Sequence, residues 1–405
     1  MKRSLSTSSI LLALLISPAA TAPPCHAFDL GEYLSINGFL SQGYIDSHGN
    51  NYLGDSQDGS FQLNEFGLTL NSAVTDNFRL GMQLLSRDVG QEGDNDVLID
   101  WAMADYRWQD WLGLRLGKVK LPIGLYNQGR DSDFLRPMVF LPQSIYDEGK
   151  RTLVVAAVGG SLYGNLSLGS SGDLEYQAYY GSVDFRSDSG QARGMALLAA
   201  RIAKMKKLGA VNDLTADNRY VYGGSLIYTP PLAGLRAGVS YFAGESDFDF
   251  DVGTGQGEAL GAMKDFVVLS MEYSLQKMIL VAEYTEQTGD REVLGFDVPD
   301  GRSQGGYVQL CYHALERLGV SAFYDVFYAD KNDHDGSGLV AQGQPDFLGW
   351  RKDLGLGLHW EITSQWLAKA EYHVVDGAAL QLAIFNPEGV ERYWNYVVLK
   401  TSFNF

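Results

Sequence analysis

The chain is poor in three features that would direct it to other classes of protein. It has two cysteines in 405 residues, and only Cys311 lies beyond the expected leader, so no internal disulfide can form. No stretch after the leader approaches the roughly 20 uninterrupted apolar residues of a membrane-spanning helix. Basic residues number 31 against 49 acidic ones, which disfavours nucleic acid as a partner because its phosphates would be repelled.

The familiar catalytic motifs are also missing. The sequence contains no G-x-S-x-G, no Walker loop and no H-E-x-x-H, and each of these carries a specific reaction or ligand. Its six histidines are scattered, and no Ser/His/Asp set has supporting spacing. We therefore expect a protein that is not an enzyme, with no cofactor and no metal site.

Residues 1–27 are predicted to be an export signal. Lys2 and Arg3 give the positive start, and the apolar run at residues 10–16 is too short to span a bilayer. Cleavage after Ala27 fits best, because Cys25 and Ala27 are small at the two positions that the peptidase reads. The mature chain is then expected to be 28–405.

Two alternatives concern the end of this leader. Cleavage after Ala22 would leave Pro23 at the new N-terminus, and Cys25 would be lipid-modified if it belonged to a lipoprotein box. The prolines at 23 and 24 disfavour both alternatives. Removing Lys2 and Arg3 changes the formal charge from −18 to −20, with 29 basic and 49 acidic residues left.

Glycine (47 residues) and tyrosine (23 residues) are abundant, and both suit a protein of many strands and tight turns. From Tyr33 onward the hydrophobic pattern has period two, as expected for strands with one apolar face. For example, Leu354, Leu356, Leu358 and Trp360 alternate with Gly355, Gly357, His359 and Glu361. We predict sixteen strands, at about 33–44, 60–72, 77–86, 96–107, 112–121, 153–163, 174–181, 219–229, 235–245, 265–275, 278–287, 305–313, 319–330, 353–362, 366–375 and 393–405.

The lengths of the connections decide between a soluble sandwich and a membrane barrel. Most predicted strands have the roughly 9–11 residues that a tilted strand needs to cross a bilayer. Seven short turns and eight long loops alternate strictly, which places all the short turns at one end, as in an outer-membrane barrel. The short turns are 73–76, 108–111, 164–173, 230–234, 276–277, 314–318 and 363–365. The long loops are 45–59, 87–95, 122–152, 182–218, 246–264, 288–304, 331–352 and 376–392.

Aromatic residues gather where the predicted strands end. Trp108 and Trp111 flank one short turn, and Trp360 and Trp366 flank another, as expected for rings at a bilayer interface. The chain ends on Phe405 after an alternating strand, an ending that resembles the terminal strand read by the barrel-insertion machinery.

The fold class predicted is therefore all-β, a single transmembrane antiparallel β-barrel of about 16 strands with short periplasmic turns and long outer loops. Closure satisfies every backbone group in lipid, where each unpaired group costs several kcal/mol. Eight strands would be filled by their own side chains, whereas 16–18 leave an aqueous channel.

The run Leu114–Leu125 (LRLGKVKLPIGL) resembles a motif of the phosphate-selective porin O/P-like superfamily, and Arg130–Pro137 (RDSDFLRP) is similar in style. The resemblance spans essentially the whole mature chain. It implies a passive channel, usually a homotrimer, whose third long loop folds into the pore. The chain departs from the phosphate-specific members because it has no dense arginine ladder.

Loop 122–152 is the candidate pore constriction, because it is long and carries charges of both signs, which would produce a transverse field. The alternative is a loop folded outward with solvated charges. The residues predicted at the constriction are Arg115, Lys118, Lys120, Arg130, Asp131, Asp133 and Arg136.

Other charged groups offer weaker hypotheses. Alternation points both signs into the lumen, where the side chains either brace the wall or bias selectivity: Arg79, Arg115, Arg219, Arg236, Lys369 and Lys400, and Glu65, Glu175, Glu272, Glu283, Asp325, Glu361 and Glu371. Two acidic groups indicate a cation-attracting mouth, or sites for divalent ions that bridge lipopolysaccharide, or only a solvated surface: Glu245, Asp247, Asp249 and Asp251, and Asp88, Glu92, Asp94 and Asp96. A basic helix at about 192–208 would either plug the mouth or cap the neighbouring loops.

These features predict an outer-membrane porin for passive diffusion of small hydrophilic solutes or ions. The alternatives are a substrate-specific channel of the anion or phosphate type, a plugged barrel acting as an adhesin or structural protein, and a barrel enzyme. The expected partners are outer-membrane lipid, lipopolysaccharide, the insertion machinery and two further copies of the chain.

Overall fold

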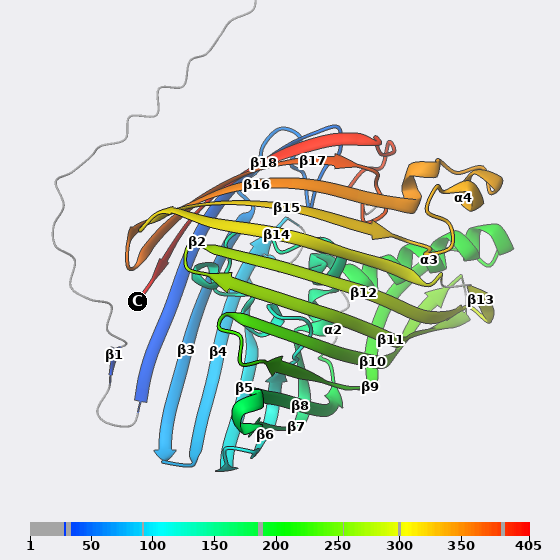
Figure 1. The fold of residues 1–405 in the computed structure, drawn as a ribbon. Coiled ribbons are helices and arrows are strands. Elements are labelled where there is room, and N and C mark those ends of the chain that lie inside the picture. The colour runs from blue at the N-terminus through cyan, green and yellow to red at the C-terminus, as the bar shows by residue number, and fades with distance from the viewer. Residues whose placement is uncertain are drawn as a thin grey trace, which may run out of the picture.

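The alternating sequence builds a wall that closes on itself. The computed structural model describes residues 28–29, 34–90, 93–184, 189–253, 255–298, 301–381 and 385–405, so the predicted signal 1–27 and Glu92 lie outside the described residues. Sixteen antiparallel strands form one barrel (Figure 1). The last strand pairs with the first long one, from Asn395 opposite His48 to Asn404 opposite Phe39, and so closes the cylinder.

All sixteen predicted strands are present, and two short ones are added. The wall strands are β2 (Leu34–His48), β3 (Leu63–Thr75), β4 (Phe78–Val89), β5 (Val97–Gln109), β6 (Leu112–Lys120), β7 (Ala156–Ser167), β8 (Asp173–Ser182), β9 (Val211–Thr229), β10 (Leu235–Val252), β11 (Gly255–Leu275), β12 (Met278–Val293), β14 (Ser303–Leu315), β15 (Leu318–Tyr328), β16 (Trp350–Thr363), β17 (Trp366–Asp376) and β18 (Tyr393–Asn404). The short strands β1 (Phe28–Asp29) and β13 (Phe296–Val298) pair with β2 and β12.

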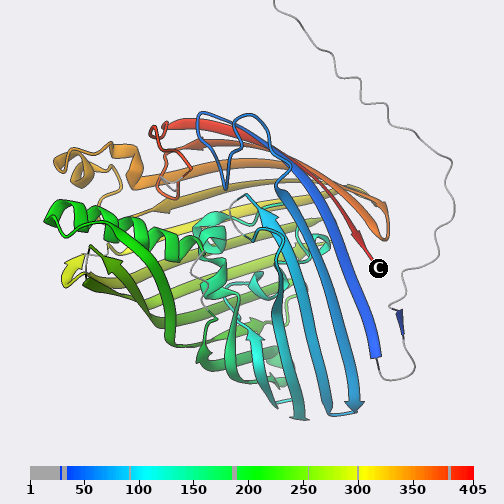
Figure 2. The same ribbon diagram turned by 180° about the vertical axis from the view of Figure 1, so that it is seen from behind.

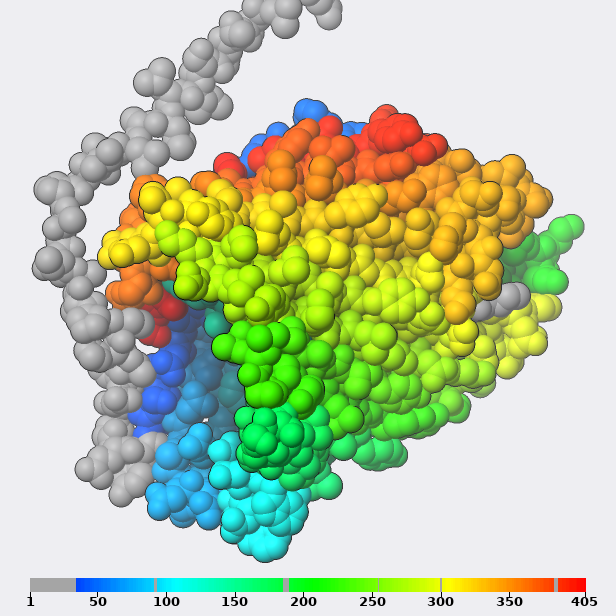
Figure 3. Space-filling view, in the orientation of Figure 1, coloured from blue at the N-terminus to red at the C-terminus, as the bar shows by residue number. Residues whose placement is uncertain are grey.

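The short turns lie at one end of the barrel and the long loops at the other (Figure 1). Rings gather at the turn end, where Trp108 lies 5.6 Å from Trp111 and Trp366 stacks on Phe403 at 5.1 Å. The space-filling view shows a continuous wall with a hollow at the short-turn end (Figure 3).

The wall is apolar outside and polar inside. Leu356 and Leu399 are about half exposed on the outer face, whereas Asp353, Glu371 and Lys400, which alternate with such residues, are at most 5% exposed inside. A soluble protein has the opposite arrangement, so the outer face is built for contact with lipid. No helix in the described part of the chain is long and apolar enough to cross a membrane.

Strands β9 to β12 are longer than predicted, and this corrects loops 182–218, 246–264 and 288–304, parts of which are strand. β10 continues from 245 to Val252, and β11 begins at Gly255 rather than 265. The reason is that the alternation continues past the membrane with acidic residues on one face and Phe248 and Phe250 on the other. These strands extend the wall beyond the loop end of the barrel (Figure 1).

Helix α3 (Gly190–Lys206) covers the inner face of this extension. Ser189 caps it by accepting a hydrogen bond from the Ala192 N–H at 3.3 Å, and Lys207 ends it in the left-handed region at φ 58°. Its buried Met195 and Ile202 pack on Phe248 and Phe250. The predicted helix therefore exists and caps the neighbouring strands.

The remaining helical segments are short. They are α1 (Gln143–Tyr146), α2 (Arg151–Val154) and α4 (Ser337–Ala341), and the 3₁₀ turns η1 (Asn127–Gly129), η2 (Asp133–Leu135), η3 (Glu148–Lys150), η4 (Gly169–Ser171) and η5 (Asp346–Gly349).

Placing a charge on the outer face tests its contact with lipid. We expect Leu356→Arg to destabilise the barrel in phospholipid vesicles by about 2–4 kcal/mol, because an arginine near the middle of the bilayer must leave water. Leu197, on α3, is similarly exposed at 45% but lies beyond the membrane wall, so Leu197→Arg is the matched control. Urea unfolding in vesicles measures both, and equal shifts would contradict the assignment of the outer face.

Candidate functional site: the loop inside the barrel

The connection between β6 and β7 folds into the barrel (Figure 2). It runs from residue 121 to 155 and includes η1, η2, α1, η3 and α2. Its apolar side chains explain this path, since Leu121, Ile123 and Tyr146 are at most 2% exposed and would meet water if the loop pointed outward. Loop 122–152, the candidate constriction, thus lies within the lumen.

The loop packs on two opposite parts of the wall. On one side Ile145 belongs to an apolar cluster with Phe242 of β10. On the other side Val139 and Phe140 belong to a cluster with Trp394 of β18. Because β10 and β18 lie about half the ring apart, the loop crosses the interior and narrows it from side to side.

Asp133 is the central charged anchor of the loop. Its carboxylate lies 2.9 Å from Nζ of Lys400 and 2.5 Å from Arg136, and it accepts a 2.6 Å hydrogen bond from the Ser402 hydroxyl. Lys400 also lies 2.6 Å from Glu65. Burial alone raises the pKa of Asp133, but the charges of Lys400 and Arg136 outweigh it and hold that pKa well below its ordinary value.

Two side chains of opposite charge on strand β17 form hydrogen bonds with the loop backbone. Nζ of Lys369 donates to three carbonyl oxygens, those of Asp133 (2.7 Å), Arg136 (2.7 Å) and Met138 (3.0 Å). Glu371 accepts a hydrogen bond from the N–H of Val139. Each charge therefore meets the backbone group of matching polarity, as buried charge requires.

Glu148 anchors the far end of the loop to β4. Its carboxylate lies 2.7 Å from Arg130 and 2.9 Å from Arg87. Burial raises its pKa, but Arg130 and Arg87 outweigh burial and lower the pKa below its ordinary value. Arg87 also lies 3.6 Å from Glu65, so this group joins the one around Asp133.

Asp131 forms a second ion-paired group near β5. It lies 2.5 Å from Arg151 and pairs with Lys120, and both cations also approach Asp100, at 3.1 and 3.6 Å. Burial raises the pKa of Asp131, and Lys120 and Arg151 together bring it well below its ordinary value.

Glu283 of β12 collects donors from the opposite side of the loop. It accepts hydrogen bonds from the Leu125 N–H (2.9 Å) and from the hydroxyls of Tyr146 (2.5 Å), Tyr307 (2.7 Å) and Ser270 (2.5 Å). Alternation pointed Glu283 inward, and bracing is the role that its contacts support.

The structure places five of the seven predicted constriction residues in two ion-paired groups of the loop: Arg130, Asp133 and Arg136 in the group around Asp133 and Glu148, and Lys120 and Asp131 in the group near β5. Arg115 is elsewhere, on the wall near the short turns, 3.3 Å from Asp105 and with its guanidinium 3.9 Å from the centre of the Tyr163 ring. Lys118 shares the outer face of β6 with Leu116 and donates to the Ile99 carbonyl at 2.8 Å. Lys118 is therefore placed away from the lumen.

The predicted acidic mouth has a different geometry from the one expected. Phe248 and Phe250 face inward against α3, so Glu245, Asp247, Asp249 and Asp251, which alternate with them, lie on the outer face of the extended wall.

Arg219 corrects one of the predicted inward positions. The β9–β10 ladder shifts register where Glu245 pairs with Tyr220 and Ser246 pairs with Asn218, which leaves Arg219 as an extra residue. This bulge turns Arg219 outward, where it pairs with Glu245 and Asp247.

Sequence reasoning missed a buried group beneath the loop. Arg351 lies 2.7 Å from Asp353 and 3.3 Å from Asp325, and Asp325 accepts from the Ser144 N–H at 3.2 Å. His373 binds Asp353 at 3.1 Å. Alternation on β16 points Arg351 and Asp353 to one face, but nothing in the sequence identifies their partners. Among the described residues, no group of three or more His, Cys, Asp or Glu is placed to hold a metal ion.

Removing one cation tests the central anchor. We expect Lys400→Met to destabilise the protein by about 3–5 kcal/mol, because Asp133 and Glu65 would both lose a buried cationic partner and keep only Arg136 and Arg87. Lys264→Met, which breaks an exposed pair with Asp290, should change the urea midpoint little. Similar midpoints for the two variants would show that the Lys400 pairs do not hold the loop.

The lowered pKa values of Asp133, Glu148 and Asp131 predict how the loop responds to acid. A carboxyl with a lowered pKa in the folded state contributes its full stability above its unfolded pKa of roughly 4 and loses it as the pH falls through the folded value. Hydrogen exchange of residues 125–150, corrected for intrinsic rates, should therefore show constant protection from pH 7 to pH 5 and lose protection only below about pH 4. Loss of protection between pH 7 and pH 5 would contradict this.

No family model matches the chain, and no curated protein matches it. Solved structures do, at low identity. OmpT of Vibrio cholerae is 11% identical, with 94% of this chain and 100% of that chain covered and a TM-score of 0.52. Salmonella typhi OmpF in complex with daunomycin is 12% identical (92% and 97% covered, TM-score 0.53), and Pseudomonas putida OprB is 11% identical (92% and 94%, TM-score 0.55). These likenesses show the fold: the chain is a closed 16-stranded antiparallel barrel similar to those of outer-membrane proteins.

Proposed function

We propose that the chain is an outer-membrane porin, a passive channel for small hydrophilic solutes whose lumen is narrowed by loop 121–155. The observation that carries the proposal is a charged loop anchored inside a closed 16-stranded barrel, since a barrel of this size is wide enough to hold an aqueous channel. We assign it no enzymatic role and no cofactor.

The proposed location in the outer membrane and the proposed partners are argued from the apolar outer face and the closing seam of the barrel. The apolar outer face is the reason to place the barrel in lipid, and the leader 1–27 is the expected route of export. Phe405 exchanges backbone hydrogen bonds of 2.9 and 3.0 Å with Gly38, which ties the expected recognition end for the insertion machinery to the closing seam. We propose a homotrimer, because one similar structure is described as the trimer form of Vibrio cholerae OmpT.

The class of solute that passes through the channel is also a proposal. We propose membership of the phosphate-selective porin O/P-like superfamily on the resemblance of residues 114–125 and 130–137 alone. We expect a preference for anions, because the outward acids Asp247 and Asp249 lie behind the wall while Lys150 and Arg291 line the outer vestibule. The outward acids offer sites for the divalent ions that bridge lipopolysaccharide.

One observation favours a second function. The loop packs on both β10 and β18 and is ion-paired along its length, as expected for a plug rather than a partial constriction. A plugged barrel would act as an adhesin or a structural protein.

Planar-bilayer recording under a salt gradient tests the porin. We expect stepwise openings and a reversal potential of the sign given by anion preference. The opposite sign would overturn the selectivity and keep the channel.

A variant that lacks the loop distinguishes a plugged barrel from a porin. Residues 125–150 are replaced by a short glycine–serine linker, and heat-modifiable migration confirms that the barrel has folded. A porin should conduct in both forms, with larger steps in the variant because the lumen is wider. Silence from the native chain together with openings from the variant would replace the porin with the plugged barrel.

A further inference from the structure

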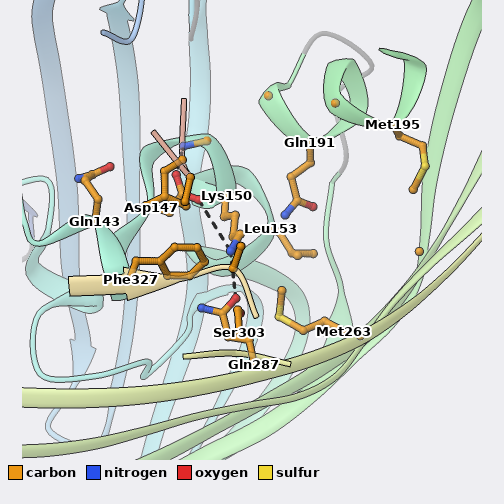
Figure 4. A pocket seen from close by; sticks show the side chains of 18 of the residues that line it. Gln143, Asp147, Lys150, Leu153, Gln191, Met195, Met263, Gln287, Ser303 and Phe327 are labelled. Atoms are coloured by element: carbon orange, nitrogen blue, oxygen red, sulfur yellow. Dashed lines mark hydrogen bonds and ion pairs between the residues drawn. The ribbon is translucent and has the colours of Figure 1, made fainter. Parts of the chain in front are cut away.

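A cavity of about 480 Å³ lies in the outer vestibule, above the loop and beneath helix α3 (Figure 4). Its walls come from the loop, α3, and strands β10 to β12 and β14 to β16. Its volume lies within the range of about 300–1,000 Å³ typical of small-molecule sites. A solute that enters from outside reaches this cavity before the constriction.

The charge of the cavity is opposite to that of the chain. Among the described residues that line it, Asp147 is the one carboxylate, whereas Lys150, Arg291 and Arg351 are cationic. The chain as a whole has 49 acidic and 31 basic residues. Arg351 is already paired with Asp353 and Asp325, so the preference of the cavity for an anion rests on Lys150, whose nearest carboxylate, Asp147, is 3.8 Å away.

Lys150 is the charged group best placed to meet a ligand. Its ammonium points into the cavity, between Gln287 and Asp147 (Figure 4). It donates to Oε1 of Gln287 at 2.9 Å, and Asp147 is 3.8 Å away. Its side chain is 24% exposed. An ammonium has three donors, so Lys150 can donate to a further anionic partner while it keeps its hydrogen bond to Gln287.

Two buried donors lack a partner in the same cavity. Tyr52 and Arg351 line it and are 6% and 1% exposed. Within the described part of the chain, the hydroxyl of Tyr52 and Nε of Arg351 have no hydrogen-bond partner. Both atoms are themselves out of reach of solvent, so the contact with an anion in the cavity rests on the Lys150 ammonium.

The rest of the lining is apolar. Leu153, Met263 and Phe327 lie around the Lys150 ammonium, and Met195 projects from α3 on the side of the cavity away from Lys150 (Figure 4). Thioether and ring surfaces of this kind accommodate a flat or branched hydrocarbon. Inorganic phosphate would cover none of this surface, whereas a ligand with an apolar body would.

We propose that this cavity binds small organic carboxylates with an apolar body, of the aromatic or branched aliphatic monocarboxylate class. The carboxylate meets Lys150 and the hydrocarbon part lies against Met263 and Phe327. The proposal deepens the porin function, on which its role in uptake rests, by naming the class of solute held before the constriction.

Calorimetric titration of the folded protein in detergent measures binding without requiring conductance. The probes are benzoate, its neutral isostere benzamide, acetate and inorganic phosphate. We expect benzoate to bind at least about tenfold more tightly than benzamide, which lacks the charge, and than acetate, which lacks the ring. Equal affinity for benzoate and benzamide, or tighter binding of phosphate than of benzoate, would overturn the proposal.

Variants locate the site. Lys150→Gln should weaken benzoate binding about tenfold and leave benzamide unchanged, whereas Lys150→Arg should retain most of the affinity because the charge is kept. Lys264→Gln makes the same change of charge on the outer face, beside Asp290, and should bind benzoate like the native chain. An unchanged affinity in folded, heat-modifiable Lys150→Gln would place the benzoate elsewhere and contradict the assignment.

Bilayer recording of the same preparations tests the channel function independently of the binding site. Benzoate binding by a protein that never conducts would support the cavity and remove the channel. Conductance without benzoate binding would keep the channel and remove the cavity as a carboxylate site.

Discussion

Backbone pairing in a medium without water is the constraint on which this structure depends. A strand in lipid has no solvent to satisfy its N–H and C=O groups, so the sheet must close, and here β18 pairs with β2 to do so. Closure in lipid also decides the sidedness of every strand. Apolar side chains such as Leu356 take the outer face, and charged ones such as Lys369 are left with the interior or the two ends.

The loop inside the barrel lies against a polar, charged interior, because the apolar side chains of the wall face outward. A loop that enters a conventional apolar core would have to be apolar itself, whereas loop 121–155 meets a wall of charge and has charges of its own. Asp133 and Glu148 each meet two cations, and the apolar residues Ile145 and Phe140 pack on opposite parts of the wall. Buried ion pairs contribute little net stability, but breaking one is costly, so the network makes this path of the loop specific.

Alternation alone predicted all sixteen strands, because lipid outside and water inside impose period two on each. It did less well where a strand leaves the bilayer. The alternation from Glu245 to Asp251 does indicate a strand extension with an acidic face, and β10 runs through it to Val252, but the predicted strand was ended at 245 because polar side chains there replace the apolar face. Arg219 was misplaced for another reason, since a single extra residue in β9 reverses the face and leaves no mark in the composition.

The residues that the loop contacts could not be predicted from the sequence, and the reason is topological. The charged residues from 130 to 136 were identified as candidates, yet Asp133 meets Lys400, which is 267 residues away in sequence. Such a pairing depends on which strand faces which part of the loop once the ring is closed. Period-two patterns give the face of a residue and say nothing of its height or of its neighbour across the lumen.

The separation of charge across the extended wall follows from the same alternation. The acids of β10 lie on its outer face, and the inner face carries α3, whose exposed side includes Arg201 and Lys204. The sheet itself separates the outward acids from a solute in the vestibule, whereas Lys150 and Arg291 line the cavity that the solute enters. The net charge of −18 sums every face of the protein, so it does not predict what a solute meets, which is set by the charges that line the cavity, such as Lys150 and Arg291.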